Sequence, residues 1–166
     1  MTRLRAVGPE EAGLVARWHV EPASPFEDWT GSPAPGTTDV TRLPPPVGGG
    51  ELLVTDDADA PLGTVSWRPV AYGPTLGSQA LEIGISLRPQ ARGQGHGSRA
   101  QRLLADYLFA TTPVHRVQAS TDVDNTAEQA ALVRAGFTVE GVLRAAQWRG
   151  AAFHDLTIYA RLRVDG

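Results

Sequence analysis

The chain has 166 residues, of which 42% are hydrophobic and 20% charged, and its formal net charge is −3. This length suits one domain with a sizeable core. The slightly acidic balance gives no electrostatic reason to expect binding to nucleic acids or anionic membranes. The sequence has no apolar run of membrane-spanning length, no signal-peptide pattern and no cysteine, so we expect a cytoplasmic protein without disulfides or cysteine chemistry. The 15 basic residues other than histidine are all arginine, which together with frequent alanine, glycine and proline indicates a GC-rich genome.

The first fifty residues predict little regular structure. Residues 4–7 have the pattern of a short strand. Pro9 and the two glutamates after it begin a helix, because proline is tolerated and acids are favoured in a first turn, and we place Trp18 of this helix in the core. From residue 21 to 50 prolines and glycines replace any regular period. An irregular insert of this length usually has a function of its own.

From residue 51 the periodicity returns and predicts strands and helices to the end of the chain. The predicted strands cover 51–55, 62–70, 81–87, 114–120, 137–143 and 153–162, and the predicted helices cover 98–109 and 126–135. Because the strands first follow one another and later alternate with helices, we expect a mixed, mostly antiparallel α/β sheet flanked by helices. The whole chain, 1–166, is predicted to form a single domain.

A glycine-rich loop precedes the helix predicted at 98–109, whose Leu103, Leu104, Tyr107 and Leu108 form one apolar stripe. Its sequence is Arg92-Gly-Gln-Gly-His-Gly97. Glycines let the backbone turn sharply and point several N–H groups into one concavity, and a helix N-terminus favours an anion. The loop therefore predicts a cofactor that carries phosphate, whereas the simpler interpretation is a surface turn ahead of an ordinary helix.

Two familiar phosphate loops do not fit this stretch. A Walker A loop needs a lysine, and the chain contains none. A dinucleotide fingerprint needs a glycine where Ser98 stands, and Pro89 separates the preceding strand from the glycines. The spacing therefore disfavours an NAD-type enzyme.

Several motifs in the same order resemble those of the GNAT N-acetyltransferases, over roughly residues 2–163. They are Glu82-Ile-Gly-Ile, Arg92-x-x-Gly95-x-Gly97, Asp122-Val-Asp-Asn125 and Arg134-Ala-Gly-Phe137. The C-terminal runs Glu140–Arg144, Gln147–Arg149 and His154–Tyr159 resemble specifically the RimJ/RimL-like branch. The resemblance implies a GNAT-type sheet that splays open beside the cofactor.

The resemblance also implies the cofactor, acetyl-CoA as acyl donor with no metal, and the residues that hold it. Backbone groups of Ile85, Ser86 and Leu87 would polarise the thioester carbonyl and pair with pantetheine. Asn125 would contact pantetheine, although asparagine at this position is also a good helix N-cap. The pyrophosphate would be held by the loop residues Arg92, Gly93, Gln94, Gly95, His96, Gly97 and Ser98.

Glu82 is the candidate catalytic base. Acyl transfer to an amine requires removal of an amine proton, and Glu82 lies in a strand on the same face as Gly84 and Ser86, just before the glycine loop. The simpler interpretation is a solvent-facing strand residue. Where many relatives carry a tyrosine as general acid, this chain has Leu132, so a non-catalytic acyl-CoA-binding or regulatory module is an alternative function.

The acceptor is the least determined part of the prediction. We expect a primary amine, either on a small molecule or at a protein N-terminus, selected by residues 19–50 and by the hairpin between the last two strands. Candidate acceptor contacts are Asp28, Trp29 and Trp148, whereas loop acids and tryptophans are also common as solvated or core residues. The four histidines are scattered without metal-ligand spacing, so no metal site is predicted, and a homodimer is left open.

Overall fold

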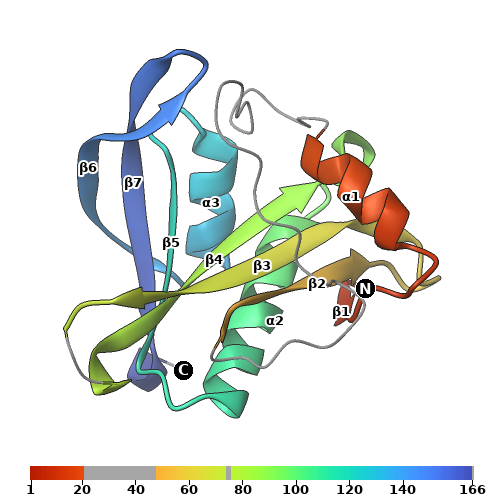
Figure 1. Cartoon of the computed structure of the whole chain (residues 1–166), viewed down its shortest axis with the longest axis horizontal. Helices are drawn as coiled ribbons and strands as arrows, with labels where there is room; N and C mark the ends of the chain where they lie inside the picture. Colours follow the sequence, from red (N-terminus) through yellow and green to blue (C-terminus); the bar gives the residue numbers. More distant parts are fainter. Residues whose placement is uncertain (21–47, 74–75, 166) are drawn as a thin grey trace.

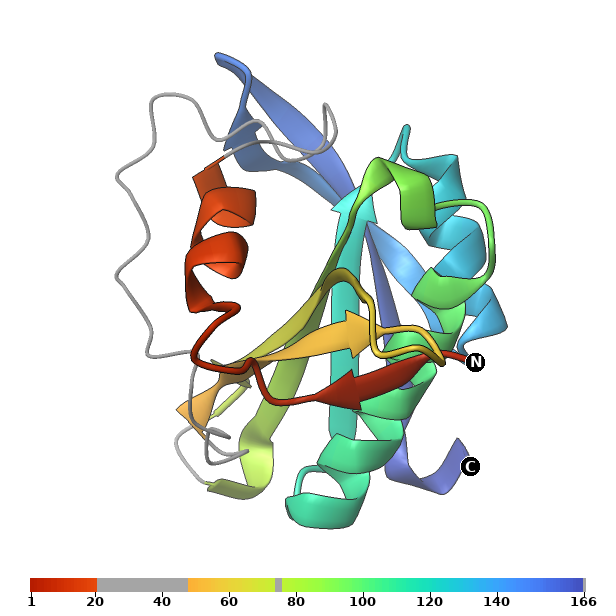
Figure 2. The same cartoon turned by 90° about the vertical axis from the view of Figure 1, so that its right-hand side faces the viewer.

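The computed structural model describes residues 1–20, 48–73 and 76–165, and its strands form one seven-stranded sheet in the order β1-β2-β3-β4-β5-β7-β6 (Figure 1). Helices α2 and α3 cover one face of the sheet, and α1 lies on the other (Figure 2). The strands are β1 (Arg3–Arg5), β2 (Gly50–Thr55), β3 (Pro61–Ala71), β4 (Gln79–Leu87), β5 (Arg116–Asp122), β6 (Thr138–Arg149) and β7 (Ala152–Leu162). The helices are α1 (Ala12–Val20), α2 (His96–Thr111) and α3 (Thr126–Arg134). The predicted mixed, mostly antiparallel sheet is confirmed.

The predicted elements match the described ones with small shifts at their ends. Strand β1 lies at Arg3–Arg5 rather than at 4–7, α1 starts at Ala12 after a turn, and α2 starts at His96, two residues earlier than predicted. Strand β6 continues to Arg149, six residues past its predicted end. Irregularities at Val139/Gly141 and Leu143/Gln147 break the alternation of the side chains, so the period cannot be read across them.

The main core lies between the sheet and helix α2. Leu81 and Ile83 of β4, Val117 of β5 and the fully buried Leu104 of α2 belong to one apolar cluster. Leu103 departs from the predicted stripe, since it is 40% exposed and lines a hollow of about 350 Å³ between α2 and β1.

Helix α1 packs on the opposite face through a smaller cluster, in which Val7, Val15 and Leu53 are buried and Trp18 is partly buried. The guanidinium of Arg88 lies 5.1 Å from the centre of the Trp18 ring. Trp18, predicted to lie in the core, is thus partly buried at the edge of this smaller cluster. Across the sheet, Leu53 pairs with Thr64 and Thr64 with Ser86, so the α1 face is also the face of Ser86.

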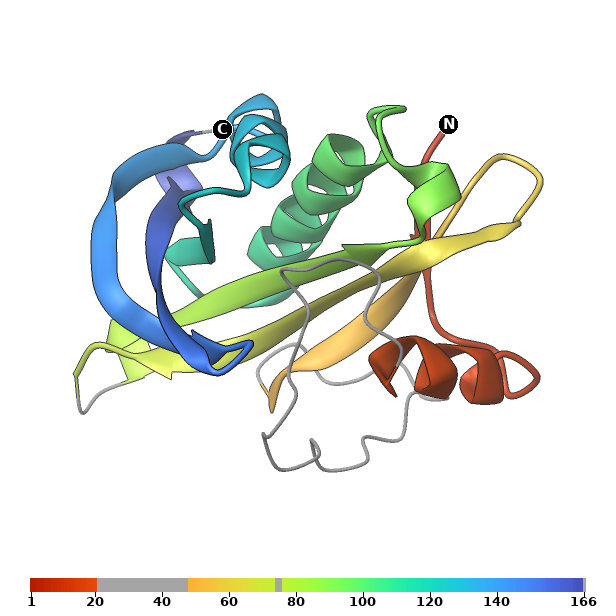
Figure 3. The ribbon, with the colours of Figure 1, turned by 90° about the horizontal axis from the view of Figure 1, so that it is seen from above.

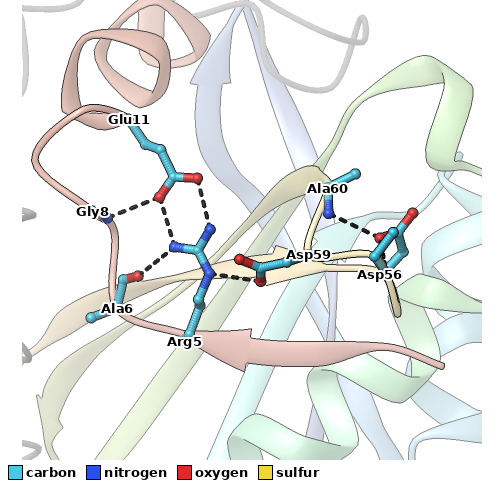
Figure 4. Close-up of polar contacts among 8 residues, drawn as sticks. Arg5, Ala6, Gly8, Glu11, Asp56, Asp59 and Ala60 are labelled. Carbon is cyan, nitrogen blue, oxygen red and sulfur yellow. Dashed lines mark hydrogen bonds and ion pairs between the residues drawn. The ribbon is translucent and has the colours of Figure 1, made fainter.

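A polar network fixes the approach of α1 to the sheet (Figure 4). The Arg5 guanidinium donates to both carboxylate oxygens of Glu11 at 2.7 Å and, through Nε, to Asp59 at 2.9 Å. Glu11 also accepts from the backbone N–H of Gly8 at 2.9 Å. The hydrogen bond from Arg5 lowers the pKa of Glu11, which favours the ionised pair. Strand β1, the start of α1 and the β2–β3 turn are therefore joined through one arginine.

The sheet opens between β4 and β5. These parallel strands pair only at Leu81 with Val117 and at Glu82 with Gln118. Beyond that point β4 keeps pairing with β3 as far as Leu87, and β5 keeps pairing with β7 as far as Asp122. From residue 83 to 87 one edge of β4 therefore no longer pairs with β5, and the two strands diverge as the resemblance implied. No helix in the part of the chain that the structure describes is both long and apolar enough to cross a membrane.

Candidate active site

The glycine loop presents free backbone donors. It joins a short turn at Pro89–Ala91 to α2, and Gly93 and Gly95 have φ values of 70° and 78°, a conformation that residues with a side chain rarely adopt. Gly95 is the N-cap of α2 and no side chain caps the helix. Within the described residues, no backbone N–H from Gly93 to Ser98 has a hydrogen-bond partner. Several donors at a positive helix end are the chemistry that an anion requires.

The polar side chains of the loop turn back onto the protein and leave the backbone open. Arg92 Nε donates to the carbonyl of Leu87 at 2.9 Å, and Gln94 donates to the carbonyl of Gln90 at 2.7 Å. His96 Nδ1 shares a hydrogen bond of 2.9 Å with the Thr2 hydroxyl, whose residue is buried. The structure therefore favours the backbone of Gln94 and His96, rather than their side chains, as ligand-binding groups.

The residues Ile85, Ser86 and Leu87 lie in the part of β4 that has diverged from β5, directly before the loop. Their pairing with β3 uses only one edge of the strand. Because N–H and C=O groups alternate between the two edges, the other edge offers donors and acceptors along the gap toward β5. This edge and the N-terminus of α2 form a continuous path, which suits an extended ligand with amides at one end and phosphate at the other.

Asn125 begins α3 on the far side of this gap. Its Oδ1 accepts from the backbone N–H of Glu128 at 3.3 Å, and its Nδ2 donates to the Thr121 hydroxyl at 3.1 Å. The N-cap interpretation is therefore correct. An amide group has further donor and acceptor capacity, so the predicted pantetheine contact stays a prediction.

Glu82 stands where the two strands part, on the α1 face. Its side chain is 18% exposed and forms an ion pair of 3.1 Å with Arg68, its direct neighbour across β3. The Ser120 hydroxyl donates to its Oε1 at 3.1 Å, and the Gln118 amide lies 3.5 Å from its Oε2. The carboxylate is thus held in place beside the open edge of β4, rather than pointing freely into solvent as in the simpler interpretation.

A polar strip continues from Glu82 across β5. Tyr72 donates its hydroxyl hydrogen to Gln118 at 2.6 Å, and Arg116 Nε donates to the same oxygen at 3.0 Å. Arg116 also binds the carboxylate of Glu140 with both terminal nitrogens, at 2.8 and 2.5 Å. These side chains order the floor of the α1 face next to the candidate base.

The hairpin of β6 and β7 lies beyond β5 and curves away from α2 and α3, toward the α1 face of the sheet (Figure 3). Buried Asp122 at the end of β5 binds two residues near the hairpin turn, Arg149 and, at 3.1 Å, Nδ1 of His154. Asp155 instead accepts from the backbone N–H of Ala145 at 2.7 Å, so the adjacent residues His154 and Asp155 do point apart. The cluster gives the hairpin a fixed position relative to β5.

Of the predicted acceptor contacts, Trp148 alone lies in the described part of the chain. It is 47% exposed near the hairpin tip and packs edge-on against Phe153, with ring centres 5.0 Å apart. Asp28 and Trp29 lie outside the described residues. Across the described ranges, no three His, Cys, Asp or Glu side chains gather as a metal-binding group.

Three residues near the site were not predicted from the sequence. Arg68 is one, because its pairing with Glu82 depends on the register of β3 and β4. Glu128 is another: burial between α2 and α3 raises its pKa to about 7, against a hydrogen bond with Gln101 that lowers it. The spacing of Asn125 and Glu128 matches a capping box, which is the signal that could have drawn attention to it. His19 pairs with Glu51 at 2.9 Å, and this hydrogen bond raises the pKa of His19.

Comparison with known proteins agrees with this geometry. The family described as "Acetyltransferase (GNAT) domain" matches residues 2–138. The chain belongs to the GNAT acetyltransferase family. The GNAT chain is 30% identical over 113 residues to "Probable N-acetyltransferase YjcK" of Bacillus subtilis, a match covering 68% of this chain and 61% of that protein. It is 31% identical over 85 residues to the ribosomal-protein-serine acetyltransferase of Escherichia coli, covering 51% and 48% of the two chains.

The chain is also similar to solved structures of acetyltransferases. A RimL ribosomal-protein acetyltransferase in complex with coenzyme A is 27% identical with a TM-score of 0.60, covering 69% of this chain and 62% of that one. These similarities support the RimJ/RimL-like branch. The fold alone is shared with a spermidine N-acetyltransferase of Vibrio cholerae in complex with coenzyme A and spermine, at 17% identity and a TM-score of 0.76, covering 99% and 96%. The matches span about half to three-fifths of the lengths of the curated relatives.

Proposed function

We propose that this chain is an acetyl-CoA-dependent N-acetyltransferase, which transfers the acetyl group directly to a primary amine without a covalent enzyme intermediate. The observation that carries the proposal is the divergence of β4 from β5 immediately after Glu82. It brings a fixed carboxylate, an open strand edge and the glycine loop along one path. Membership of the GNAT family and relatives named N-acetyltransferases support the same activity.

In this mechanism acetyl-CoA supplies the acetyl group as a thioester, and the chain positions and deprotonates the amine. Glu82 accepts the amine proton through a water, so that the neutral amine can attack the carbonyl carbon. A backbone N–H from Ile85 to Leu87 donates to the carbonyl oxygen as negative charge develops there. The backbone from Arg92 to Ser98 would hold the pyrophosphate, and Asn125 would contact the pantetheine across the gap.

The leaving thiolate must receive its proton from a group other than the tyrosine that many relatives use. Leu132, where many relatives carry a tyrosine, is fully buried in the core and has no proton to give. We infer that the thiolate takes its proton from water or from the ammonium product. The same feature supports the alternative function, a non-catalytic acyl-CoA-binding or regulatory module.

The acceptor is proposed to be a small-molecule amine or a protein N-terminus. The names of the similar proteins point both ways, to ribosomal proteins and to spermidine.

We further propose a cytoplasmic bacterial protein, with 1–166 as a single domain and the proline-rich insert on the acceptor side. It would not use a metal, nucleic acid or membrane. Exposed apolar side chains on the edge strand β6, Val139, Val142 and Leu143, support the homodimer that the sequence leaves open.

A thiol-release assay with acetyl-CoA across peptides, polyamines and aminoglycosides tests the proposal. We expect release that depends on an amine, together with mass-spectrometric detection of the acetylated product. If the protein binds acetyl-CoA and acetylates none of these amines, the binding-module alternative is correct instead.

A further inference from the structure

The charges on the α1 face are already matched to one another. Glu51 pairs with His19, and Glu140 is bound by both terminal nitrogens of Arg116. Glu82 pairs with Arg68. A polyamine brings additional ammonium groups that need carboxylates, and each of these three would have to break an ion pair to receive one. Among the described residues, this face is therefore poorly suited to a polycationic acceptor.

Arg68 differs from Arg116, an arginine of β5 on the same face. Arg116 is only 21% exposed, and its guanidinium is taken up by Glu140 and Gln118. The side chain of Arg68 is 73% exposed and its only interaction within the described residues is the single contact with Glu82. A guanidinium carries five N–H donors in a planar fork. Most donors of Arg68 thus point into solvent directly beside the candidate base.

The floor next to Glu82 and Arg68 is made of small residues. Ser66 of β3 pairs with Gly84 of β4, one step along the same face, and a Cβ placed on Gly84 would meet the Ser66 hydroxyl. Gly84 itself is exposed. An amine that lies over Gly84 can reach the carboxylate of Glu82, and its next substituent then lies within reach of the Arg68 fork.

We propose that Arg68 is an anion-binding residue of the acceptor site, which selects primary amines that carry a carboxylate close to the amino group. This inference rests on the proposed acetyltransfer to amines. The Arg68 fork is complementary to a carboxylate, which it can bind with two parallel hydrogen bonds. Acceptors of this class include amino acids and protein N-termini with an acidic residue next to the first.

Matched pairs of acceptors test the role of Arg68. The pairs are β-alanine with β-alaninamide, and alanyl-aspartate amide with alanyl-asparagine amide, each differing by one carboxylate, with spermidine as a polycation. Thiol release is measured for the wild-type protein and for the variants Arg68→Gln and Arg3→Gln. Arg3 is an exposed arginine on the far edge strand, so its variant controls for the loss of one positive charge.

We expect the wild-type protein to prefer the carboxylate member of at least one pair by about five- to tenfold in kcat/KM, mainly through KM. Arg68→Gln should bring that ratio close to one, and Arg3→Gln should preserve it. The ratio cancels any effect of the variant on Glu82, because both members of a pair use the same base. The proposal is overturned if Arg68→Gln leaves the ratio unchanged, or if the wild-type protein prefers the amides or spermidine. Absence of turnover on every amine would instead overturn the proposed function itself.

Discussion

Glu128 makes the stability of this protein depend on pH in a way that one substitution can isolate. Its carboxyl lies between α2 and α3, where burial raises its pKa from 4.5 to about 7. A folded-state pKa above the unfolded value means that the native state holds its proton more tightly. The associated stability is fully present below about pH 4.5 and is lost as the pH rises through about 7.

The size of the effect follows from the shift. At about 1.4 kcal/mol for each pH unit, a rise from 4.5 to about 7 corresponds to roughly 3 kcal/mol of stability lost by pH 8. For a domain of this size, that is a difference of roughly 6–12 °C in melting temperature. Glu128→Gln removes the titration and keeps an amide that can hydrogen-bond to Gln101, so it should escape the loss.

Thermal and urea unfolding at pH 5, 6, 7 and 8 measures this dependence. The advantage of Glu128→Gln over the wild-type protein should grow from pH 5 to about pH 7 and level off toward pH 8. Glu10→Gln, a change at an exposed glutamate, serves as the control and should show no such trend. If the difference between Glu128→Gln and the wild-type protein is constant from pH 5 to pH 8, the reasoning about burial is wrong.

Two further predictions concern the anchoring of α1 and the cofactor path. Arg5→Gln should lower the free energy of unfolding by about 1–2 kcal/mol in urea titrations, because Glu11 keeps its position and loses both charged hydrogen bonds; an unchanged midpoint would refute the role of the network in Figure 4. Gly97→Ala should fold normally, because its Cβ would meet Leu87, Ile85 and Ala131 only at ordinary contact distances of 3.6–4.0 Å. The same change should weaken acetyl-CoA binding at least about tenfold in calorimetry, because the methyl group enters the gap where pantetheine is proposed to lie. Gly13→Ala, on α1 and with open space around it, is the matched control, and equal affinities in the two variants would contradict the proposed path.

Much of the fold could be predicted because its local patterns agree with its tertiary structure. The alternation from Leu81 to Leu87 fixed which side chains face α2, and the register confirms that Glu82, Gly84 and Ser86 share the other face. The glycines before α2 marked the open helix end correctly, since Gly95 does adopt a left-handed conformation. These features depend on neighbours in the sequence, so a period or a spacing is enough to reveal them.

The remaining features depend on contacts between distant segments. The pairing of Arg68 with Glu82 requires the register of β3 and β4, and the burial of Glu128 requires the packing of α3 on α2. The full length of β6 was hidden by its two irregularities, which shift the alternation that a strand prediction relies on. Strand register and helix packing are set by contacts between distant segments, so neither the propensity of single residues nor their periodicity reveals them.

The proposed role of Glu82 as the base beside the open edge of β4 is the central claim, and Glu82→Gln tests it most directly. The change keeps the shape of the side chain and an oxygen that can accept from Gln118, and the Ser120 hydroxyl can accept from the new amide. It removes the negative charge that accepts a proton. With an amine that the wild-type protein acetylates, we predict that kcat falls by about 10²–10⁴-fold while the acetyl-CoA dissociation constant stays within about twofold. A variant that binds acetyl-CoA and turns over the amine at close to the wild-type rate would contradict the account.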